Sequence, residues 1–255
     1  MTPHPLPLRP MQTSQERLPV GEVAGKRAYV RDMFTAIAPR YDFLNHLLSL
    51  NVDRLWRRQA VAQLGWEQVP GGTYLDVCSG TMDLAAALGN RVGFTGRVVG
   101  ADFVQPMLVL GKGKSARVTP VTADALDLPF PDGLFDGATV GFGVRNLADL
   151  DAGLREMARV LKPGARLVIL EFTTPRIQPL RSLYFSYFRH VLPAIGHFFS
   201  NHANAYTYLR DSVLAFPEPE ALAERMARAG FREVKWRRLT GGICAWHCGV
   251  RSGTK

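Results

Sequence analysis

A short apolar segment that ends in a glycine turn constrains the fold of this chain more than any other feature of its sequence. The segment, residues 73–77, predicts a buried strand, and a Ser-Gly-Thr turn at 79–81 separates it from a helix. A second apolar strand, residues 97–102, ends in an aspartate. A strand, a glycine turn, a helix and a second strand ending in an acid form the nucleotide-binding half of a doubly wound α/β fold.

Strands and helices then alternate along the rest of the chain. We expect further strands at 117–122, 135–141 and 165–172, helices at 83–89, 104–113 and 149–161, and a last helix at 217–229 before two final strands at 231–239 and 243–250. Gly241 and Gly242 predict a hairpin between those final strands.

Parallel strands followed by an antiparallel hairpin distinguish class I methyltransferases from dehydrogenases, and the first turn lacks the three-glycine pattern of dinucleotide sites. The predicted fold class is therefore α/β, as in class I S-adenosylmethionine-dependent methyltransferases. It comprises a Rossmann-like, mostly parallel seven-stranded sheet, a C-terminal antiparallel hairpin and N-terminal lid helices.

The chain before the first strand divides into two parts. Residues 1–24 are rich in proline and without periodicity, which predicts a disordered tail; an organelle-targeting role stays open, but no apolar centre of a signal peptide is present. Residues 25–66 predict two helices placed as a lid over the carboxyl ends of the strands, the second capped by Asn51 or Asp53. We expect a single domain over 25–250, with an insertion at 175–212 and a tail at 251–255.

Composition and charge exclude several classes of protein. The chain of 255 residues is 47% hydrophobic and 21% charged, with no apolar run of the roughly 20 residues that would span a bilayer. Three cysteines suit a reducing compartment, and their spacing does not suit a metal, so we expect no metal site. The net charge of +9 is scattered, which favours a basic exterior or a membrane surface over nucleic acid.

The turn after the first strand provides candidate contacts for the amino-acid end of a ligand. Gly80 lets the backbone approach the ligand, the following helix start offers N–H groups to a carboxylate, and Thr81 adds a hydroxyl donor. Asp76 could accept a hydrogen bond from a ligand ammonium group. The alternative is an ordinary strand-to-helix turn.

The next two strand ends provide contacts for a nucleoside. Asp102 is placed to bind two ribose hydroxyls, and Met107 either packs on the adenine face or belongs to the core. Asp124 can accept from the adenine amino group while the Ala125 N–H meets a ring nitrogen; the alternative for Asp124 is a solvated loop acid.

The fourth strand ends in a candidate reaction site. Gly141 and Gly143 clear space where a methyl group would leave sulfur, and Arg145 and Asn146 follow beside the acceptor. An arginine in this place is a surface charge in most folds, but the flanking glycines and the asparagine favour a site.

The chain resembles a known family, the ubiquinone/menaquinone biosynthesis C-methyltransferases of UbiE type, from about residue 29 to residue 250. The segments that carry the resemblance are MFTAIAPRYD at 33–42, LN at 44–45, DRLWRR at 53–58, LPFPD at 128–132, FGVRN at 142–146, REMARVLKPG at 155–164, LEF at 170–172 and LTGGI at 239–243. The resemblance implies S-adenosylmethionine as cofactor, contacted by Thr81, Asp102, Asp124 and Ala125 and approached by Gly141.

The sequence departs from the family pattern at three positions. Met82 stands where the family has glycine, Gly141 where it has serine, and Ala165 where it has a second glycine. A side chain at Met82 would crowd the cofactor or oppose a positive φ angle, so we expect weaker cofactor binding. A non-catalytic cofactor-binding or scaffold relative therefore stays as an alternative.

The resemblance also implies the reaction, the C-methylation of a polyprenylated quinol. Demethylmenaquinol is the favoured acceptor, and the methoxy-benzoquinol step of ubiquinone synthesis or another small molecule or RNA stays open. Only the reduced ring is nucleophilic, so we expect Arg145 to stabilise the developing phenolate while Asn146 and Tyr41 orient the ring.

The insertion after the fifth predicted strand is relevant to where the protein is located in the cell. Residues 180–199 are aromatic, basic and helical in period, which suits either a membrane-surface entry for the polyprenyl tail or packing on the lid helices. We expect a cytoplasmic protein with a polyprenyl quinol substrate and no nucleic-acid partner. Peripheral contact with the inner face of the membrane and a homodimer stay open.

Overall fold

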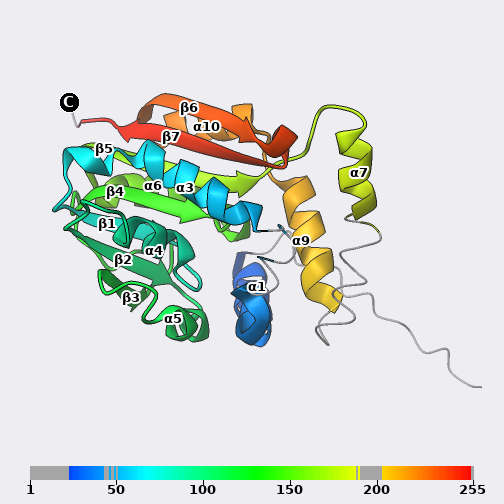
Figure 1. Cartoon of the computed structure of the whole chain (residues 1–255), viewed down its shortest axis with the longest axis horizontal. Coiled ribbons are helices and arrows are strands. Elements are labelled where there is room, and N and C mark those ends of the chain that lie inside the picture. The colour runs from blue at the N-terminus through cyan, green and yellow to red at the C-terminus, as the bar shows by residue number, and fades with distance from the viewer. Residues whose placement is uncertain are drawn as a thin grey trace, which may run out of the picture.

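A seven-stranded sheet forms the centre of the molecule (Figure 1). The structure is a computed structural model that describes residues 23–42, 46, 49, 51–187, 189 and 203–253. The strands are β1 Thr73–Val77, β2 Arg97–Asp102, β3 Val118–Thr122, β4 Phe135–Gly141, β5 Leu161–Phe172, β6 Phe231–Leu239 and β7 Cys244–Arg251. The order β3-β2-β1-β4-β5-β7-β6, with β1 to β5 parallel and β6 and β7 antiparallel, confirms the predicted fold class.

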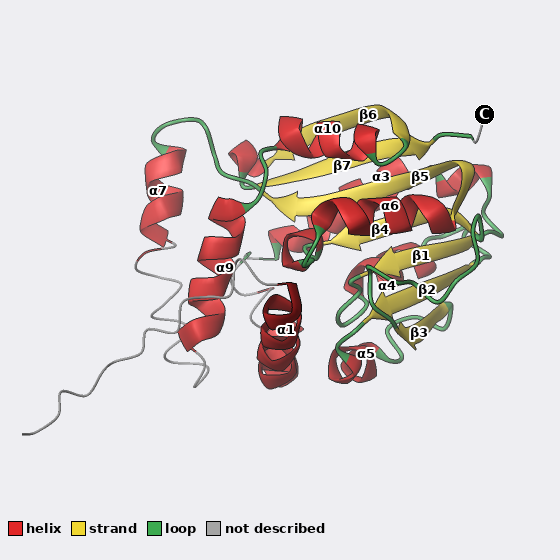
Figure 2. Cartoon of the chain, turned by 180° about the vertical axis from the view of Figure 1, so that it is seen from behind, coloured by secondary structure: helices red, strands yellow, loops and turns green. Residues whose placement is uncertain are grey.

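Helices cover both faces of this sheet. The helices and 3₁₀ turns are α1 Val23–Ile37, η1 Ala38–Arg40, α3 Val52–Leu64, η2 Trp66–Gln68, α4 Asp83–Gly89, α5 Gln105–Gly111, η3 Val144–Asn146, α6 Leu150–Val160, α7 Leu180–Ser186, α9 Ala203–Ala215, α10 Pro219–Arg228 and η5 Thr240–Gly242. α3 and α4 lie on one face (Figure 1), and α6 and α10 lie on the other (Figure 2). α1, α7 and α9 lie beyond the carboxyl ends of the parallel strands, which is the edge where ligands bind in this fold class.

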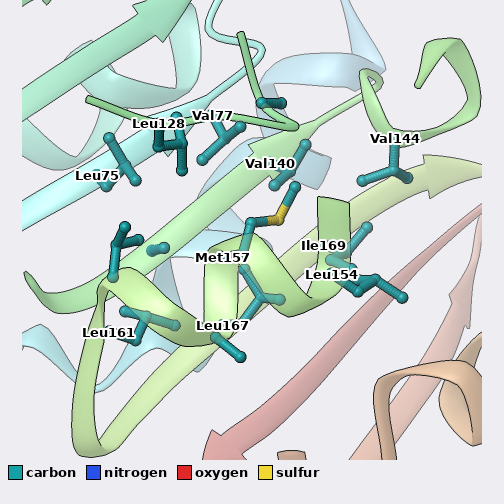
Figure 3. Close-up of a cluster of buried hydrophobic side chains, with 14 of the residues drawn as sticks. Leu75, Val77, Leu128, Val140, Val144, Leu154, Met157, Leu161, Leu167 and Ile169 are labelled. Atoms are coloured by element: carbon teal, nitrogen blue, oxygen red, sulfur yellow. The ribbon is translucent and has the colours of Figure 1, made fainter. Parts of the chain in front are cut away.

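Burial on both faces explains why the central strands are continuous apolar runs. Leu167, Val168, Ile169 and Leu170 of β5 are each 0% exposed. Figure 3 shows Leu75, Val77 and Val140 of the sheet facing Met157 of α6 across one core cluster. The close packing of these strands fixes the positions of their carboxyl ends, from which the site is built.

Three predictions about the N-terminal half of the chain need correction. α3 packs on the sheet through Trp56, Ala60, Val61 and Leu64, so of the two expected lid helices only α1 lies over the strand ends. The two expected caps also fail. The Asn51 side chain makes no capping bond, and the Asp53 carboxylate binds Ser49, His46 and Arg57 instead.

β5 begins at Leu161, four residues before the predicted start at 165, because Leu161 pairs with Phe135 of β4 ahead of a register shift, after which Arg166 pairs with Gly137. Gly164 within that segment has a φ of +84°. No helix within the described ranges is long and apolar enough to cross a bilayer. The predicted tail up to residue 22, Asn45 and the segment 190–202 lie outside the described residues.

Candidate active site

The loop between β1 and α4 is shaped by residues in the left-handed region. Cys78, Gly80 and Met82 have φ values of 52°, 54° and 62°. Met82 therefore adopts the positive φ that we expected its side chain to oppose. Its side chain is 1% exposed and fills the space beside Gly100 and Gly111, where an added Cβ would lie 3.0–3.1 Å from Met82 atoms. Two glycines thus accommodate this methionine, which is not among the residues that line the cavity described below. The expected effect on cofactor binding stays a prediction.

Two of the predicted contact residues are engaged within the protein. The Asp76 carboxylate, 1% exposed, accepts hydrogen bonds from Thr139 Oγ1 at 2.7 Å, Ser79 Oγ at 2.6 Å and the Ala85 N–H at 3.1 Å. Burial raises the pKa of Asp76 to about 6. Asp76 thus connects β1, β4 and α4.

Thr81 is 3% exposed, and its hydroxyl donates to Asp42 in the segment that follows α1. The structure therefore does not bring Asp76 or Thr81 to the cavity wall, although Thr81 does connect the loop to the N-terminal segment.

Asp102 lies at the end of β2, where parallel strands of this class present a ribose-binding acid. Its carboxylate is 7% exposed and accepts from the Gly80 and Val104 N–H groups, both at 2.8 Å. Burial raises the pKa of Asp102 despite these hydrogen bonds. The two N–H groups fix the orientation of the carboxylate at the cavity wall.

A narrow cavity lies between these strand ends and α1. Among the predicted site residues, it is lined by Tyr41, Gly80, Asp102, Met107, Asp124, Ala125, Gly141 and Asn146. Arg27, Val30 and Phe34 of α1 line the opposite side, and Arg27 forms an ion pair with Asp124. The cavity volume is about 60 Å³, well below the roughly 300–1,000 Å³ of small-molecule sites. In this conformation, with α1 closing one side, the cavity is too small to hold a nucleoside.

Arg145 of η3 is held by Phe142, which follows β4, and by groups of β5. Its Nη1 donates to Glu171 Oε1 at 2.8 Å and to the Phe142 carbonyl. The guanidinium carbon lies 5.5 Å from the centroid of the Phe172 ring. Burial is the largest influence on the pKa of Arg145 and acts to lower it, but the Glu171 carboxylate, Tyr41 and Tyr208 together raise that pKa above the usual arginine value. Arg145 is therefore a permanent cation, not a base.

A second cavity of about 420 Å³ lies on the other side of η3. Arg145, Lys26, Tyr29 and Tyr208 line it, and Leu147 and Ala148 line both cavities. The Tyr208 hydroxyl donates to Asn146 Oδ1 at 3.2 Å, and burial raises the pKa of Tyr208 to about 12. The Lys26 ammonium donates to the carbonyls of Arg145 and Leu147 at 3.2 and 2.7 Å, and burial lowers its pKa.

Acidic side chains near the first turn of α3 could in principle hold a cation. Ligand atoms of His46, Asp53 and Asp83 lie within 4.8 Å of one another. Arg57 lies 3.4 Å from the Asp53 carboxylate, and Lys114 lies 2.5 Å from the Asp83 carboxylate. Because cations of the protein already pair with these acids, we interpret the cluster as an ion-pair network.

The sequence reasoning missed Glu171, Tyr208, Lys26 and Arg27. Glu171 stands in a segment that carries the family resemblance, but nothing there shows that its partner is 26 positions away. Tyr208 of α9 contacts Asn146, which lies 62 positions earlier in the chain. No sequence motif in α1 or α9 predicts the contacts of Lys26, Arg27 or Tyr208.

Comparison with known proteins supports one family. The model of the ubiE/COQ5 methyltransferase family matches residues 22–251. A ubiquinone/menaquinone biosynthesis C-methyltransferase UbiE of Geobacter sulfurreducens is 48% identical, covering 87% of this chain and 88% of that protein. Demethylmenaquinone methyltransferases of Deinococcus radiodurans and Thermus thermophilus are 48% and 49% identical, covering 93% and 86% of this chain and 98% and 100% of theirs.

Solved structures support the fold. A SAM-dependent methyltransferase of Thermotoga maritima, described as a possible histamine N-methyltransferase, has a TM-score of 0.61 at 21% identity, covering 87% of this chain and 99% of that one. The [4+2]-cyclase SpnF has a TM-score of 0.63 at 18% identity, covering 88% and 96%. Because a cyclase has the same fold, the fold alone does not decide the chemistry.

Proposed function

The chain belongs to the ubiE/COQ5 methyltransferase family, and we propose that it methylates a ring carbon of a polyprenylated quinol, with demethylmenaquinol as the acceptor. As a member of this family it is an S-adenosylmethionine-dependent C-methyltransferase of quinone biosynthesis. The choice of a naphthoquinol follows from the names of the Deinococcus and Thermus relatives. The name of the Geobacter relative includes ubiquinone biosynthesis, so a methoxy-benzoquinol is the second candidate acceptor.

The residues around the first cavity fit S-adenosylmethionine. Asp102 and Asp124 present carboxylate acceptors for ribose hydroxyls and an adenine amino group at neighbouring strand ends. Gly80 leaves its backbone open, since an added Cβ would meet nothing nearer than the end of Met107 at 3.5 Å. When bound, the cofactor supplies an electrophilic methyl group on a sulfonium. Because the Met82 side chain lies away from this cavity, we favour an active enzyme over a non-catalytic relative.

The observation that carries the proposal is the position of η3 between the two cavities. Gly141 and Asn146 line the first cavity, and Arg145 lines the second. Leu147 and Ala148 line both cavities, so the two adjoin beside η3, where the methyl group and the acceptor ring would come into direct contact. The second cavity is large enough for a fused aromatic ring, and Tyr208 and Lys26 add polar groups to its wall. We propose it as the acceptor chamber.

Arg145 would stabilise the phenolate that makes the ring carbon nucleophilic. A phenol has a pKa near 10, so at neutral pH a fixed cation is needed to favour ionisation. Tyr208 lines the second cavity together with Arg145, and Tyr41 lines the first. Asn146, which accepts from Tyr208, and Tyr41 line the first cavity, so we propose that they orient the edge of the ring that reaches the methyl group.

The test is methyl transfer from labelled S-adenosylmethionine to short-tailed demethylmenaquinol and its benzoquinol counterpart, with the oxidised quinones as controls. Product from a quinol but not from its quinone supports the proposal and identifies the acceptor. In parallel, Arg145→Ala should lower turnover by about 100-fold or more, the cost of removing one donor to a developing oxyanion. Its cofactor affinity should change little, and an equal loss of both would contradict the role of Arg145.

Two statements about location and assembly remain proposals. Ile177 and Leu183 are each 68% exposed and Leu214 is 50% exposed, on segments beyond the carboxyl ends of the strands. We propose that this end of the molecule contacts the membrane that holds the polyprenyl tail. A homodimer stays a prediction, which light scattering of the purified chain would check.

A further inference from the structure

The ion pair between Arg145 and Glu171 is the most deeply buried one among the described residues. The side chains are 6% and 1% exposed, and Arg145 Nη1 lies 2.8 Å from Glu171 Oε1. The other carboxylate oxygen accepts from the Arg145 backbone N–H at 3.4 Å, while Oε1 also accepts from the Phe172 N–H at 2.9 Å. Glu171 thus binds both the backbone and the side chain of Arg145.

Stability does not explain this pair. The free energy needed to remove two charges from water is about as large as the free energy gained from their attraction. A buried ion pair can therefore often be replaced by apolar side chains without loss of stability. β5 is apolar and 0% exposed from Leu167 to Leu170, so a further apolar residue at 171 would continue the strand. A charged residue at this position therefore calls for another explanation.

We infer that Glu171 is a positioning residue, which fixes the Arg145 guanidinium at the wall of the acceptor chamber. This inference rests on the proposed function, because it gives Glu171 a role only through Arg145. Glu171 and the Phe142 carbonyl both bind Nη1, and the Phe172 ring lies beside the guanidinium carbon. Three groups thus restrain the guanidinium, one from the residue that follows β4 and two from the end of β5.

One donor of the Arg145 guanidinium has no partner within the described part of the protein. Within the described part of the chain, Arg145 Nε is buried and has no hydrogen-bond partner. A buried donor without a partner is costly, and such donors in native proteins call for an explanation such as a ligand. An arginine whose Nη1 is held and whose Nε has no partner is suited to donate a hydrogen bond to a phenolate oxygen.

The sign of the effect separates positioning from simple electrostatics. Glu171 neutralises Arg145, so removing its charge would strengthen the positive potential at the chamber and favour phenolate formation. If charge were its whole role, Glu171→Gln would speed methyl transfer at neutral pH. If Glu171 positions Arg145, the same substitution slows it, because a misplaced catalytic group loses much of its effect.

The experiment uses the full chain with S-adenosylmethionine and the quinol that the wild type accepts. We expect Glu171→Gln to lower kcat by at least about 10-fold while the cofactor dissociation constant stays within about twofold. Glu171→Asp, which keeps the charge but shortens the side chain, should give an intermediate kcat. Glu156→Gln is the control, because Glu156 pairs with Arg159 at 2.7 Å within α6 and with side chains 14% and 32% exposed, and it should keep the wild-type kcat.

A double-mutant cycle tests whether Glu171 acts through Arg145. In the Arg145→Gln background, Glu171→Gln should lower kcat no further. The double variant carries no unpaired buried charge, so it can still be measured if the Glu171→Gln variant fails to fold. A wild-type or higher kcat in Glu171→Gln, or the same fold loss in both backgrounds, would overturn the inference. If the wild type methylates no quinol, the proposed function fails and the inference fails with it.

Discussion

At the scale of single residues, Met82 shows how a departure from a family pattern can be absorbed. A non-glycine residue at a φ of 62° carries backbone strain, of about 1–2 kcal/mol for an L-residue in the left-handed region. Its side chain, 1% exposed, compensates by filling the space that Gly100 and Gly111 leave open. Sequence reasoning anticipated the strain, but the direction of the side chain depends on glycines 18 and 29 positions further along the chain.

Met82→Gly should therefore destabilise the protein without tightening cofactor binding. Loss of a buried methionine costs about 2–5 kcal/mol, and relief of the backbone strain returns part of it, so we expect a net loss of about 1–3 kcal/mol. Urea denaturation and calorimetric titration with the demethylated cofactor measure the two effects. Met157→Ala, in the other core cluster, should cost more because no strain is relieved. A tenfold gain in cofactor affinity for Met82→Gly would show that Met82 does crowd the site.

Asp76 predicts a pH dependence of stability. Its pKa is about 6 in the folded chain and near 3.8 when unfolded. The folded state thus binds the proton more tightly, so the free energy of unfolding falls as pH rises from about 4 to 6 and is flat above that.

Asp76→Asn removes this titration. The free energy of unfolding of the wild type, minus that of the variant, should therefore fall between pH 4 and 6. At 1.36 kcal/mol per pKa unit, the fall should be at most about 3 kcal/mol. Denaturation curves at pH 4, 5, 6 and 7 provide the comparison. Parallel pH profiles for the two proteins would contradict the prediction.

At the scale of elements, the α/β alternation was predictable because each strand of the sheet is a short apolar run between turn residues. β1, β2 and β4 have the predicted bounds, and the hairpin of β6 and β7 follows the two glycines. The place of α3 was not predictable, because an amphipathic helix before a sheet can cover a face or an edge equally well. Its apolar side chains pack against β5 and β7, which come more than 90 residues later in the chain.

The candidate site was predictable where it consists of strand ends, and not where it consists of contacts between distant elements. Asp102, Asp124 and Gly141 follow strands and line the first cavity. The Asp76 carboxylate also belongs to a strand, but a buried acid binds whichever donors surround it, here Thr139, Ser79 and Ala85. Periodicity within one strand carries no information about those donors.

The contacts of helix α1 predict that Arg27 and the cofactor compete for the Asp124 carboxylate. Arg27 pairs with Asp124, which we propose as the acceptor for the adenine amino group. Arg27→Ala should free that carboxylate and tighten cofactor binding, but only slightly, because an ion pair whose arginine side chain is 54% exposed contributes at most about 1 kcal/mol. We therefore expect a dissociation constant up to about fivefold lower, measured by titration calorimetry.

Arg31→Ala is the matched control for the lid, since Arg31 is on the same helix, is 58% exposed and pairs with Asp32 on the surface. Both variants lose one positive charge, so a difference between them reports on Asp124 alone. Weaker cofactor binding in Arg27→Ala than in Arg31→Ala would mean that Arg27 serves the bound cofactor and is not its competitor.

At the scale of the whole molecule, exposed apolar side chains gather at one end, beside an arginine and an aromatic ring on α7. The chain carries a net charge of +9, and α7, α9 and α1 gather beyond the carboxyl ends of the strands (Figure 2). Leu183 on α7 is 68% exposed, and Arg181 on the same helix lies over the Phe185 ring at 5.7 Å. A basic and aromatic helix with an exposed leucine is suited to the interface of an anionic bilayer.

Binding to vesicles that contain phosphatidylglycerol should therefore depend on this end of the molecule and on salt. Burying one leucine side chain contributes about 1.5–3 kcal/mol, so Leu183→Asp should weaken binding by 10-fold or more in co-sedimentation. Val92→Asp is the matched control, because Val92 is 97% exposed in the loop before β2, at the opposite edge of the sheet. At 1 M salt the screening length falls to about 3 Å, so the electrostatic part of binding should disappear while the difference between the two variants persists. Equal binding by Leu183→Asp and Val92→Asp would mean that charge alone attracts the protein to the bilayer, and the proposed membrane-facing end would then be wrong.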